Sequence, residues 1–115
     1  MQRPDPSAPS ASFRQGDRDG TPVVEVFGDV DVATSAEFRS ALIAALDRGD
    51  GTLIVDFAEL DFIDSSGLGV LVGTLKRARE RGGSVTIENP APSARKILAI
   101  TGLLELFGLE DEGEG

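Results

Sequence analysis

The chain contains no cysteine and no histidine. Without cysteine it has no disulfides and no thiolate nucleophile. Without histidine it lacks the usual general base near neutral pH, the Ser-His-Asp triad and the commonest metal ligand. Tryptophan and tyrosine are also absent, which leaves only phenylalanine as an aromatic platform for nucleic-acid bases. We therefore expect a protein that is not an enzyme and that binds no metal and no cofactor.

Basic residues are in the minority, because 20 acids against 11 bases give the 115 residues a net charge of −9. An acidic chain is repelled by phosphate backbones and by anionic lipid surfaces, so we expect neither nucleic-acid binding nor membrane binding. Apolar runs are short, and none approaches the roughly 20 residues that span a bilayer. The N-terminus has no apolar segment of the kind found in signal peptides. The cytoplasm is the expected location.

Strand and helix patterns alternate along the chain and predict a single α/β domain. Residues 1–12, rich in Pro, Ser and Ala, are predicted to form a disordered arm, residues 13–110 the folded domain, and residues 111–115 an acidic tail. The predicted strands are 13–18, 21–27, 53–57, 84–88 and a short one around Leu106 and Phe107, and the predicted helices are 34–48, 66–81 and 92–101. This order gives a mostly parallel sheet of four or five strands with about three helices. The Asp-Gly pair at 19–20 predicts an antiparallel hairpin at one edge.

Apolar spacing predicts which faces of these elements are buried. Thr34 followed by Glu37 fits a capping box at the start of the first helix. The positions expected in the core are Val24, Val26 and Phe27 in the second strand, Leu68, Leu71, Val72, Leu75 and Ala78 in the second helix, and Ile97, Leu98, Ile100 and Thr101 in the third. Each helix would then present one apolar stripe to the rest of the fold.

Residues 61–69, Asp-Phe-Ile-Asp-Ser-Ser-Gly-Leu-Gly, join a buried strand to a helix. In parallel sheets, ligands meet the loops at the carboxyl ends of the strands. The loop at 28–31 follows another strand, so the two loops share one edge if their strands are neighbours. Four carboxylates would then surround Ser65, those of Asp29, Asp31, Asp61 and Asp64. The sequence therefore predicts an acidic functional edge centred on a serine.

The residues of this edge are open to four interpretations. In the first, Asp64 or Ser65 only caps the helix by accepting an amide hydrogen bond. In the second, a serine is a nucleophile, but the chain has no histidine and no nearby lysine before Lys76 to serve as its base. In the third, Asp56, Asp61 and Asp64 form a metal or phosphoaspartate site, for which the spacing is loose and the accompanying lysine has no clear counterpart.

The fourth interpretation is a regulatory phosphoserine. A phosphoryl group adds about −1.5 to −2 charges. The free amides at a helix start tolerate that charge, but the neighbouring aspartates do not neutralise it, so the group must face outward. A partner docked on this edge would then meet a bulky dianion. Phosphorylation would switch binding off without refolding the domain.

Residues 62–71, Phe-Ile-Asp-Ser-Ser-Gly-Leu-Gly-Val-Leu, resemble the phosphorylation motif of the STAS domain in bacterial anti-sigma factor antagonists. Further segments are similar to that family in the same order. Phe-Gly-Asp-Val-Asp at 27–31 resembles its acidic loop, and Leu-Ile-Val-Asp-Phe at 53–57 resembles the strand before its motif. The remaining matches are Gly82-Gly83 with Val85, Asn89-Pro90, and Ile100-Thr101-Gly102-Leu103. The resemblance covers about residues 13–110.

The resemblance implies a STAS fold and a partner switch. The unphosphorylated protein would bind an anti-sigma factor that is also a serine kinase, and a sigma factor would be released. That kinase would phosphorylate Ser65 and so switch binding off, and a metal-dependent serine phosphatase would reverse the modification. ATP would belong to the kinase. The resemblance implies that Asp64, Ser66 and Gly67 support the loop, and that the partner-binding residues are Asp29, Asp31, Asp61 and Leu68.

Two rival functions remain open at this point. One is a stand-alone STAS subunit of a larger assembly, such as a lipid-transport complex, on which no kinase acts. The acidic pair Asp29 and Asp31 beside an intact Asp-Ser-Ser-Gly at 64–67 favours the phosphoserine switch. The other rival is a small receiver-like phosphoaspartate domain, which hydroxylamine treatment would distinguish by cleaving its acyl phosphate. We expect a monomer, with weak dimerisation at most.

Overall fold

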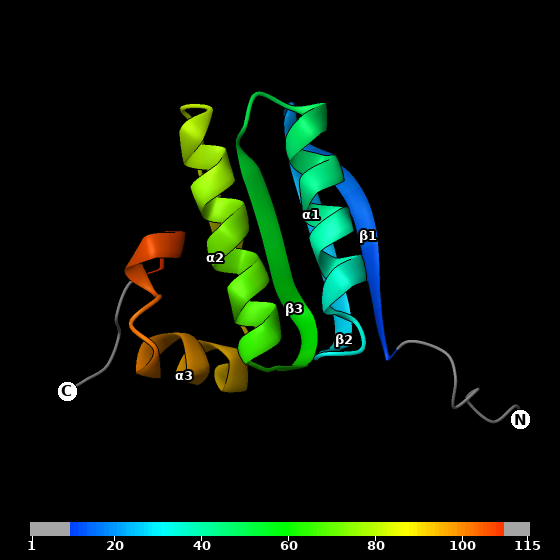
Figure 1. Cartoon of the computed structure of the whole chain (residues 1–115), viewed down its shortest axis with the longest axis vertical. Helices are drawn as coiled ribbons and strands as arrows, with labels where there is room; N and C mark the ends of the chain where they lie inside the picture. Colours follow the sequence, from blue (N-terminus) through cyan, green and yellow to red (C-terminus); the bar gives the residue numbers. More distant parts are fainter. Residues whose placement is uncertain (1–9, 110–115) are drawn as a thin grey trace, which may run out of the picture.

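A mixed four-stranded sheet forms the centre of the computed structural model, which describes residues 10–109 (Figure 1). The elements follow in the order β1 (Ala11–Arg18), β2 (Thr21–Val30), α1 (Ser35–Arg48), β3 (Leu53–Ile63), α2 (Ser65–Glu80), β4 (Val85–Glu88), α3 (Pro92–Ile100) and a short 3₁₀ helix, η1 (Glu105–Phe107). The predicted α/β fold with a mostly parallel sheet is confirmed. The strands lie in the spatial order β1-β2-β3-β4.

The sheet begins with the predicted hairpin. β1 pairs antiparallel with β2, and Arg18 lies opposite Thr21, so the connection has only two residues. Asp19 and Gly20 both have positive φ, 51° and 92°, which is the geometry that a two-residue hairpin loop requires. β2 with β3 and β3 with β4 are parallel pairs. The carboxyl ends of these three strands therefore lie at one edge of the sheet.

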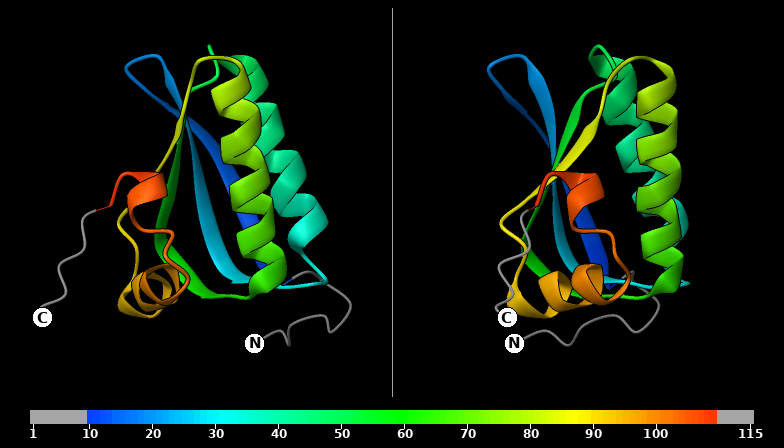
Figure 2. Two further views of the ribbon diagram at one scale, coloured as in Figure 1. Left: turned by 60° about the vertical axis from the view of Figure 1, so that its left-hand side comes forward. Right: turned by 90° about the vertical axis from the view of Figure 1, so that its left-hand side faces the viewer.

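Helices α1 and α2 lie side by side on one face of the sheet, and α3 lies at the end of the sheet where the parallel strands finish (Figures 1 and 2). The core fills the space between the sheet and these two helices. Its fully buried side chains include Val24, Val26, Leu53, Val55 and Phe57 from the strands and Phe38, Leu42, Leu46 and Leu71 from the helices. None of the helices within residues 10–109 is long and apolar enough to cross a membrane.

Two predictions about strands are wrong. Residues 105–107 form the 3₁₀ helix η1 and not a fifth strand, because Phe107 is buried in the core beside β4 in a single turn. Phe27 is only partly buried, and it faces outward because the strand alternates and both Val24 and Val26 point into the core. On that outer face the guanidinium carbon of Arg14 lies 5.4 Å from the centre of the Phe27 ring.

The apolar stripes of α2 and α3 are rotated from the predicted positions. In α2, Val70 and Thr74 are buried where Val72 was expected, and Val72 is exposed. The reason is that α2 packs against α1 as well as against the sheet, so its buried arc turns toward its neighbour. Thr74 tolerates burial because its hydroxyl donates a 2.7 Å hydrogen bond to the Val70 carbonyl. In α3, Ala94 and Leu98 are the buried residues, whereas Ile100 is 73% exposed. Thr101, also expected in the core, is exposed and lies just after the helix ends.

The boundaries of the folded region differ slightly from those predicted. β1 begins at Ala11, which falls inside the range predicted for the N-terminal arm. Ala11 is buried, because it lies opposite Gly28 of β2. The rest of that arm, residues 1–9, and residues 110–115 of the predicted tail lie outside the described residues.

Candidate functional site

The two acidic loops lie next to each other at the carboxyl-end edge of the sheet, as predicted. Asp29 of β2 lies opposite Phe62 of β3, and Val30 lies opposite Ile63. The backbone N–H of Asp64 donates to the carbonyl of Val30 at 3.1 Å. The last residues of both strands are therefore fixed to each other where α2 begins.

Asp64 caps the first turn of α2. One of its carboxylate oxygens, Oδ1, accepts hydrogen bonds from the backbone N–H of Ser66 at 2.9 Å and of Gly67 at 3.3 Å. The same oxygen accepts from the Ser66 hydroxyl at 2.5 Å. These hydrogen bonds hold the pKa of Asp64 below its usual value. The bond from the Ser66 hydroxyl has the largest effect, and those from the backbone N–H groups have smaller ones. The capping interpretation is therefore correct for Asp64, and this role leaves Ser65 uninvolved.

The two serines of the motif have different environments. Ser66 is partly buried, and its hydroxyl is committed to Asp64. Ser65 is exposed, and within residues 10–109 its hydroxyl makes no hydrogen bond. An enzyme that approaches from solvent can therefore reach the Ser65 hydroxyl without breaking a contact. The sequence alone could not distinguish the two serines in this way.

Gly67 lies where α2 passes closest to the sheet. A Cβ added to this residue would lie 2.6 Å from Cγ1 of Ile63 and 2.7 Å from Cγ1 of Val30. Glycine is therefore required by close approach and not by a positive φ. This contact sets how closely the first turn of α2, and with it Ser65, approaches the ends of β2 and β3.

The loop between β2 and α1 is held by its own side chains, and the predicted capping box is absent. Thr34 is buried, and its hydroxyl donates to the Asp29 carbonyl at 2.9 Å and accepts from the Asp31 N–H at 2.9 Å. Since that hydroxyl is occupied, it makes no cap bond to α1. The Asp31 carboxylate accepts instead from the N–H groups of Ala33, at 2.9 Å, and Thr34, at 3.2 Å.

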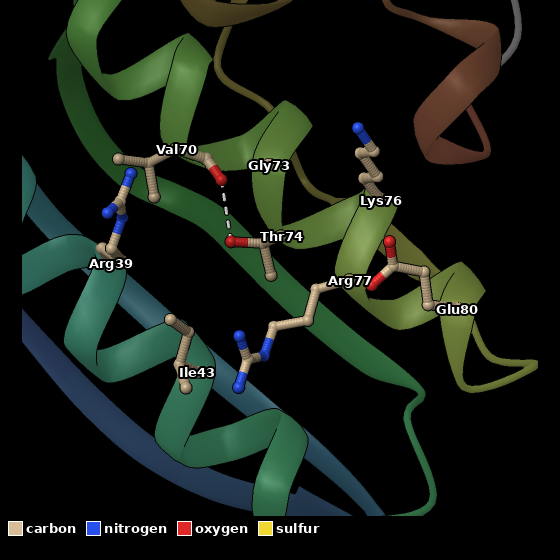
Figure 3. A pocket seen from close by; sticks show the side chains of 8 residues that line it. All are labelled: Arg39, Ile43, Val70, Gly73, Thr74, Lys76, Arg77 and Glu80. Carbon is tan, nitrogen blue, oxygen red and sulfur yellow. Dashed lines mark hydrogen bonds between the residues drawn. The ribbon is translucent and has the colours of Figure 1, made fainter.

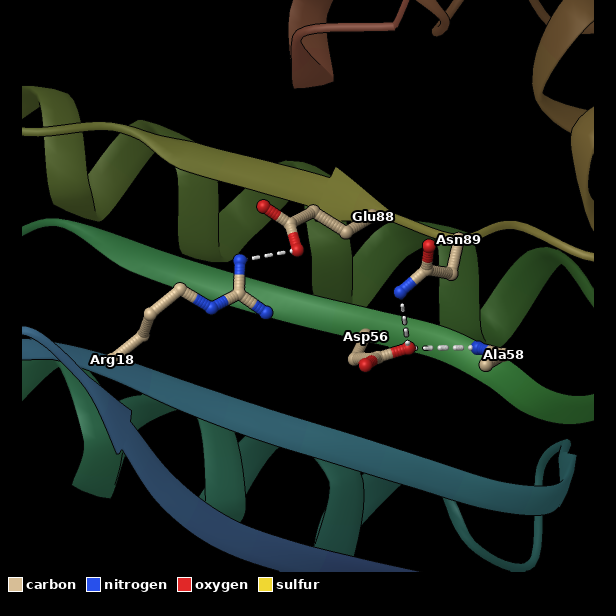
Figure 4. A network of polar contacts seen from close by, with 5 residues as sticks. All are labelled: Arg18, Asp56, Ala58, Glu88 and Asn89. Carbon is tan, nitrogen blue, oxygen red and sulfur yellow. Dashed lines mark hydrogen bonds and ion pairs between the residues drawn. The ribbon is translucent and has the colours of Figure 1, made fainter.

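The aspartates do not form one cluster. Asp31 turns into its own loop, Asp61 is exposed, and Asp64 faces the start of α2. Asp56 lies eight residues before Asp64 along β3, about 26 Å at strand spacing. It accepts from the N–H of Ala58 at 2.9 Å (Figure 4). Within the described part of the chain, no group of three or more acidic side chains is placed to hold a metal ion.

Apolar side chains that the sequence patterns did not predict are exposed at this edge. Val32, in the loop between β2 and α1, is 79% exposed, and Phe62, near the end of β3, is 48% exposed. Leu68, predicted to bind a partner, is partly buried and packs against the core. The alternation of β3 is the signal that would have identified Phe62, because Ile63 must point inward.

A hollow of about 620 Å³ lies between the first turns of α1 and α2. Its walls include Ser65 and Ser66 of α2, together with the polar side chains of Ser35, Arg39 and Ser40 of α1. Arg39 is a positive side chain beside a predicted phosphorylation site, and its position in the sequence did not identify it as part of the site. No local pattern could have done so, because the two helices are brought together only by tertiary packing.

Comparisons with known proteins match this arrangement over most of the chain. The family model described as the STAS domain matches residues 15–113. The anti-sigma-B factor antagonist of Bacillus subtilis (strain 168) is 32% identical over 92 residues, which cover 80% of this chain and 84% of that protein.

Two solved structures are also similar. The anti-sigma factor antagonist SpoIIAA in its unphosphorylated form has a TM-score of 0.72 and 28% identity, covering 88% of this chain and 90% of that chain. The Bacillus cell fate determinant SpoIIAA in the phosphorylated form has a TM-score of 0.66 and 27% identity, covering 88% and 93%. The residues that the family model matches include the Asp-Ser-Ser-Gly loop at 64–67.

Proposed function

Because the chain belongs to the STAS domain family, we propose that it is an anti-sigma factor antagonist whose partner binding is switched by phosphorylation of Ser65. The unphosphorylated form binds an anti-sigma factor that is also a serine kinase, and a sigma factor is released. A metal-dependent serine phosphatase restores the binding form. The protein itself is not an enzyme, and it acts as a monomer in the cytoplasm.

The observation that carries this proposal is the contrast between the two serines. The Ser65 hydroxyl is exposed and without a hydrogen bond in the described residues, whereas the Ser66 hydroxyl is held by Asp64 at 2.5 Å. A kinase modifies a hydroxyl that it can reach and orient. The similarity to SpoIIAA, which has been solved in a phosphorylated and an unphosphorylated form, supports the same interpretation.

The surroundings of Ser65 suit a docking surface that charge can disable. Val32 and Phe62 offer exposed apolar contacts beside it, and Asp61 offers a negative charge to a basic partner. A phosphoryl group adds about −1.5 to −2 charges and three acceptor oxygens. Placed against a desolvated contact, that charge opposes binding through its hydration and bulk. The domain need not refold, because Ser65 contributes nothing to the cap.

The test is a binding titration with the anti-sigma factor kinase from the same cell. We expect Ser65→Ala to bind as wild type does but to resist modification, and Ser65→Asp to bind more weakly. Ser66→Ala is the control, because it should still yield a phosphopeptide carrying the phosphate at Ser65. Wild-type affinity of Ser65→Asp, or loss of the phosphate only in Ser66→Ala, would contradict the proposed switch. A modification that hydroxylamine removes would indicate a phosphoaspartate instead.

A further inference from the structure

The hollow beside Ser65 continues along the cleft between α1 and α2, and Arg39 lies where its two parts meet. The first part, described above, contains Ser65. The second, of about 220 Å³, extends toward the far end of α2 and is lined by Arg39, Thr74 and Arg77, among others. Figure 3 shows the Arg39 side chain pointing from α1 toward Val70 of α2. Arg39 is exposed, but its side chain is directed toward α2 and not away from it.

Arg39 has no negative partner in the described part of the chain. The basic side chains of Arg14, Arg18 and Arg81 form ion pairs, but Arg39 forms none. Among the residues that line the two parts of the hollow, Glu80 is the one carboxylate, and it lies at the opposite end from Arg39 (Figure 3).

The nearby carboxylates are already engaged or point elsewhere. Asp64 accepts three hydrogen bonds from the first turn of α2, and Asp31 accepts from its own loop. Glu37 of α1 is exposed and does not line the hollow. A negative group that enters the hollow from Ser65 therefore meets Arg39 as its positive neighbour. The side-chain hydroxyls of Ser35 and Ser40 line the same wall.

We propose that Arg39 is the internal counter-ion of phosphorylated Ser65, so that the modification links α1 to α2 across the hollow. This inference rests on the proposed phosphorylation of Ser65. A guanidinium has a planar set of N–H donors that matches two phosphate oxygens. Pairing favours the dianion, so the second pKa of the phosphoserine lies below its ordinary value of about 6. The phosphate is then fully charged at neutral pH and fixed over the docking surface.

The experiment uses the full-length chain with phosphoserine installed at position 65 during translation, so no kinase is required. The second pKa of the phosphate is measured by ³¹P NMR in wild type and in Arg39→Gln. We expect the midpoint in Arg39→Gln to be higher by about half a pH unit, the size that an exposed ion pair supports. The difference should shrink in 1 M salt, where the Debye length is about 3 Å.

Arg77→Gln is the matched control, because it removes the same charge from the part of the hollow that does not contain Ser65. We expect it to leave the midpoint near that of wild type, and Arg39→Lys to recover part of the shift. Equal midpoints in wild type and Arg39→Gln, or equal shifts in the two glutamine variants, would overturn the pairing. Neither result would affect the switch, which is tested separately by kinase binding to Ser65→Asp.

Melting temperatures provide a second measurement on the same proteins. If phosphorylation links α1 to α2, it should change the melting temperature of the wild type more favourably than that of Arg39→Gln. Each change is measured between the phosphorylated and the unmodified form of the same protein. Because each variant is compared with itself, any general loss of stability caused by the substitution cancels. An identical effect of phosphorylation on both proteins would contradict the proposed link.

Discussion

The guanidinium of Arg18 contacts the carboxylate of Glu88 at 2.5 Å, although Arg18 is on β1 and Glu88 is on β4 (Figure 4). These strands are the two edges of the sheet, and β2 and β3 lie between them. The Arg18 side chain therefore reaches over the outer face of the sheet. The hydrogen bond that Arg18 donates to Glu88, and then the negative charge of Glu88, raise the pKa of Arg18. The contact connects the hairpin to the strand that precedes α3.

We expect this ion pair to contribute a small stabilisation that salt removes. Both side chains are partly exposed, and exposed pairs are weakened as the Debye length falls from about 10 Å at 0.1 M to about 3 Å at 1 M. Thermal melting of Arg18→Gln, Glu88→Gln and the double variant gives the coupling between the two. The coupling should be favourable at low salt and close to zero at 1 M. A coupling that is unchanged by salt would contradict an exposed ion pair.

Gly67→Ala should destabilise the domain by about 1–3 kcal/mol, the usual effect of overpacking. The new Cβ would lie 2.6 Å from Ile63 and 2.7 Å from Val30, so the start of α2 must move away from the sheet. Urea denaturation measures the change through the midpoint, at an unchanged slope. The same displacement should weaken kinase binding, because Ser65 begins the same helical turn.

Gly73→Ala is the matched control for that experiment. Gly73 is also in α2, and a Cβ there meets no atom within 4 Å. Since alanine is favoured over glycine inside a helix, this variant should be more stable than wild type by about 0.5–1 kcal/mol. Equal stability of the two alanine variants would show that the close approach at Gly67 does not constrain the helix.

Ser66→Ala should raise the pKa of Asp64 toward its ordinary value. The Ser66 hydroxyl is the largest cause of the lowered pKa, and its removal leaves only the hydrogen bonds from backbone N–H groups. Because the folded-state pKa is lowered, the stabilisation by Asp64 is present above the unfolded-state value of about 3.9 and is lost as pH falls through the folded value. NMR titration of the Asp64 carboxyl carbon measures the shift. Ser65→Ala is the control and should leave it unchanged, since Ser65 makes no bond to Asp64 in the described residues.

Much of the site follows from order along the chain. Alternating strands and helices predicted a parallel sheet, and a parallel sheet brings the loops after β2 and β3 to one edge. The chain order therefore predicted that the loops containing Asp29 and Asp64 share one edge if their strands are neighbours, and the pairing of β2 with β3 confirms that they are. The sequence did not predict why glycine is required at position 67, because the contacts with Val30 and Ile63 arise only when α2 packs against the sheet.

The remaining features depend on packing between elements that are distant in sequence. Val70 and Thr74 are buried because α1 lies beside α2, and a periodicity count within one helix contains no information about that neighbour. Thr34 matched a capping box, but its hydroxyl binds Asp29 and Asp31 instead, since the loop before α1 folds back on β2. Arg39 lines the hollow beside Ser65 only because α1 packs against α2, so no pattern within α1 could have predicted it.

The exposed apolar side chains at the carboxyl-end edge should carry much of the affinity for the proposed kinase. Phe62 is 48% exposed, and truncation of an aromatic anchor in an interface commonly costs more than about 1–2 kcal/mol. We therefore expect Phe62→Thr to weaken kinase binding about tenfold or more. Threonine is β-branched and, like phenylalanine, is favoured in strands, so stability should change by no more than about 0.5 kcal/mol.

Ile100→Thr is the control for that variant, because Ile100 is 73% exposed but belongs to α3 and does not flank Ser65. Calorimetric titration with the kinase should give wild-type affinity for Ile100→Thr and reduced affinity for Phe62→Thr. Both proteins should melt near the wild-type temperature, which separates a lost contact from a lost fold. Equal affinities of the two variants would mean that the partner docks elsewhere and that Phe62 makes no contribution. Weakening by Ile100→Thr alone would instead place the kinase on α3.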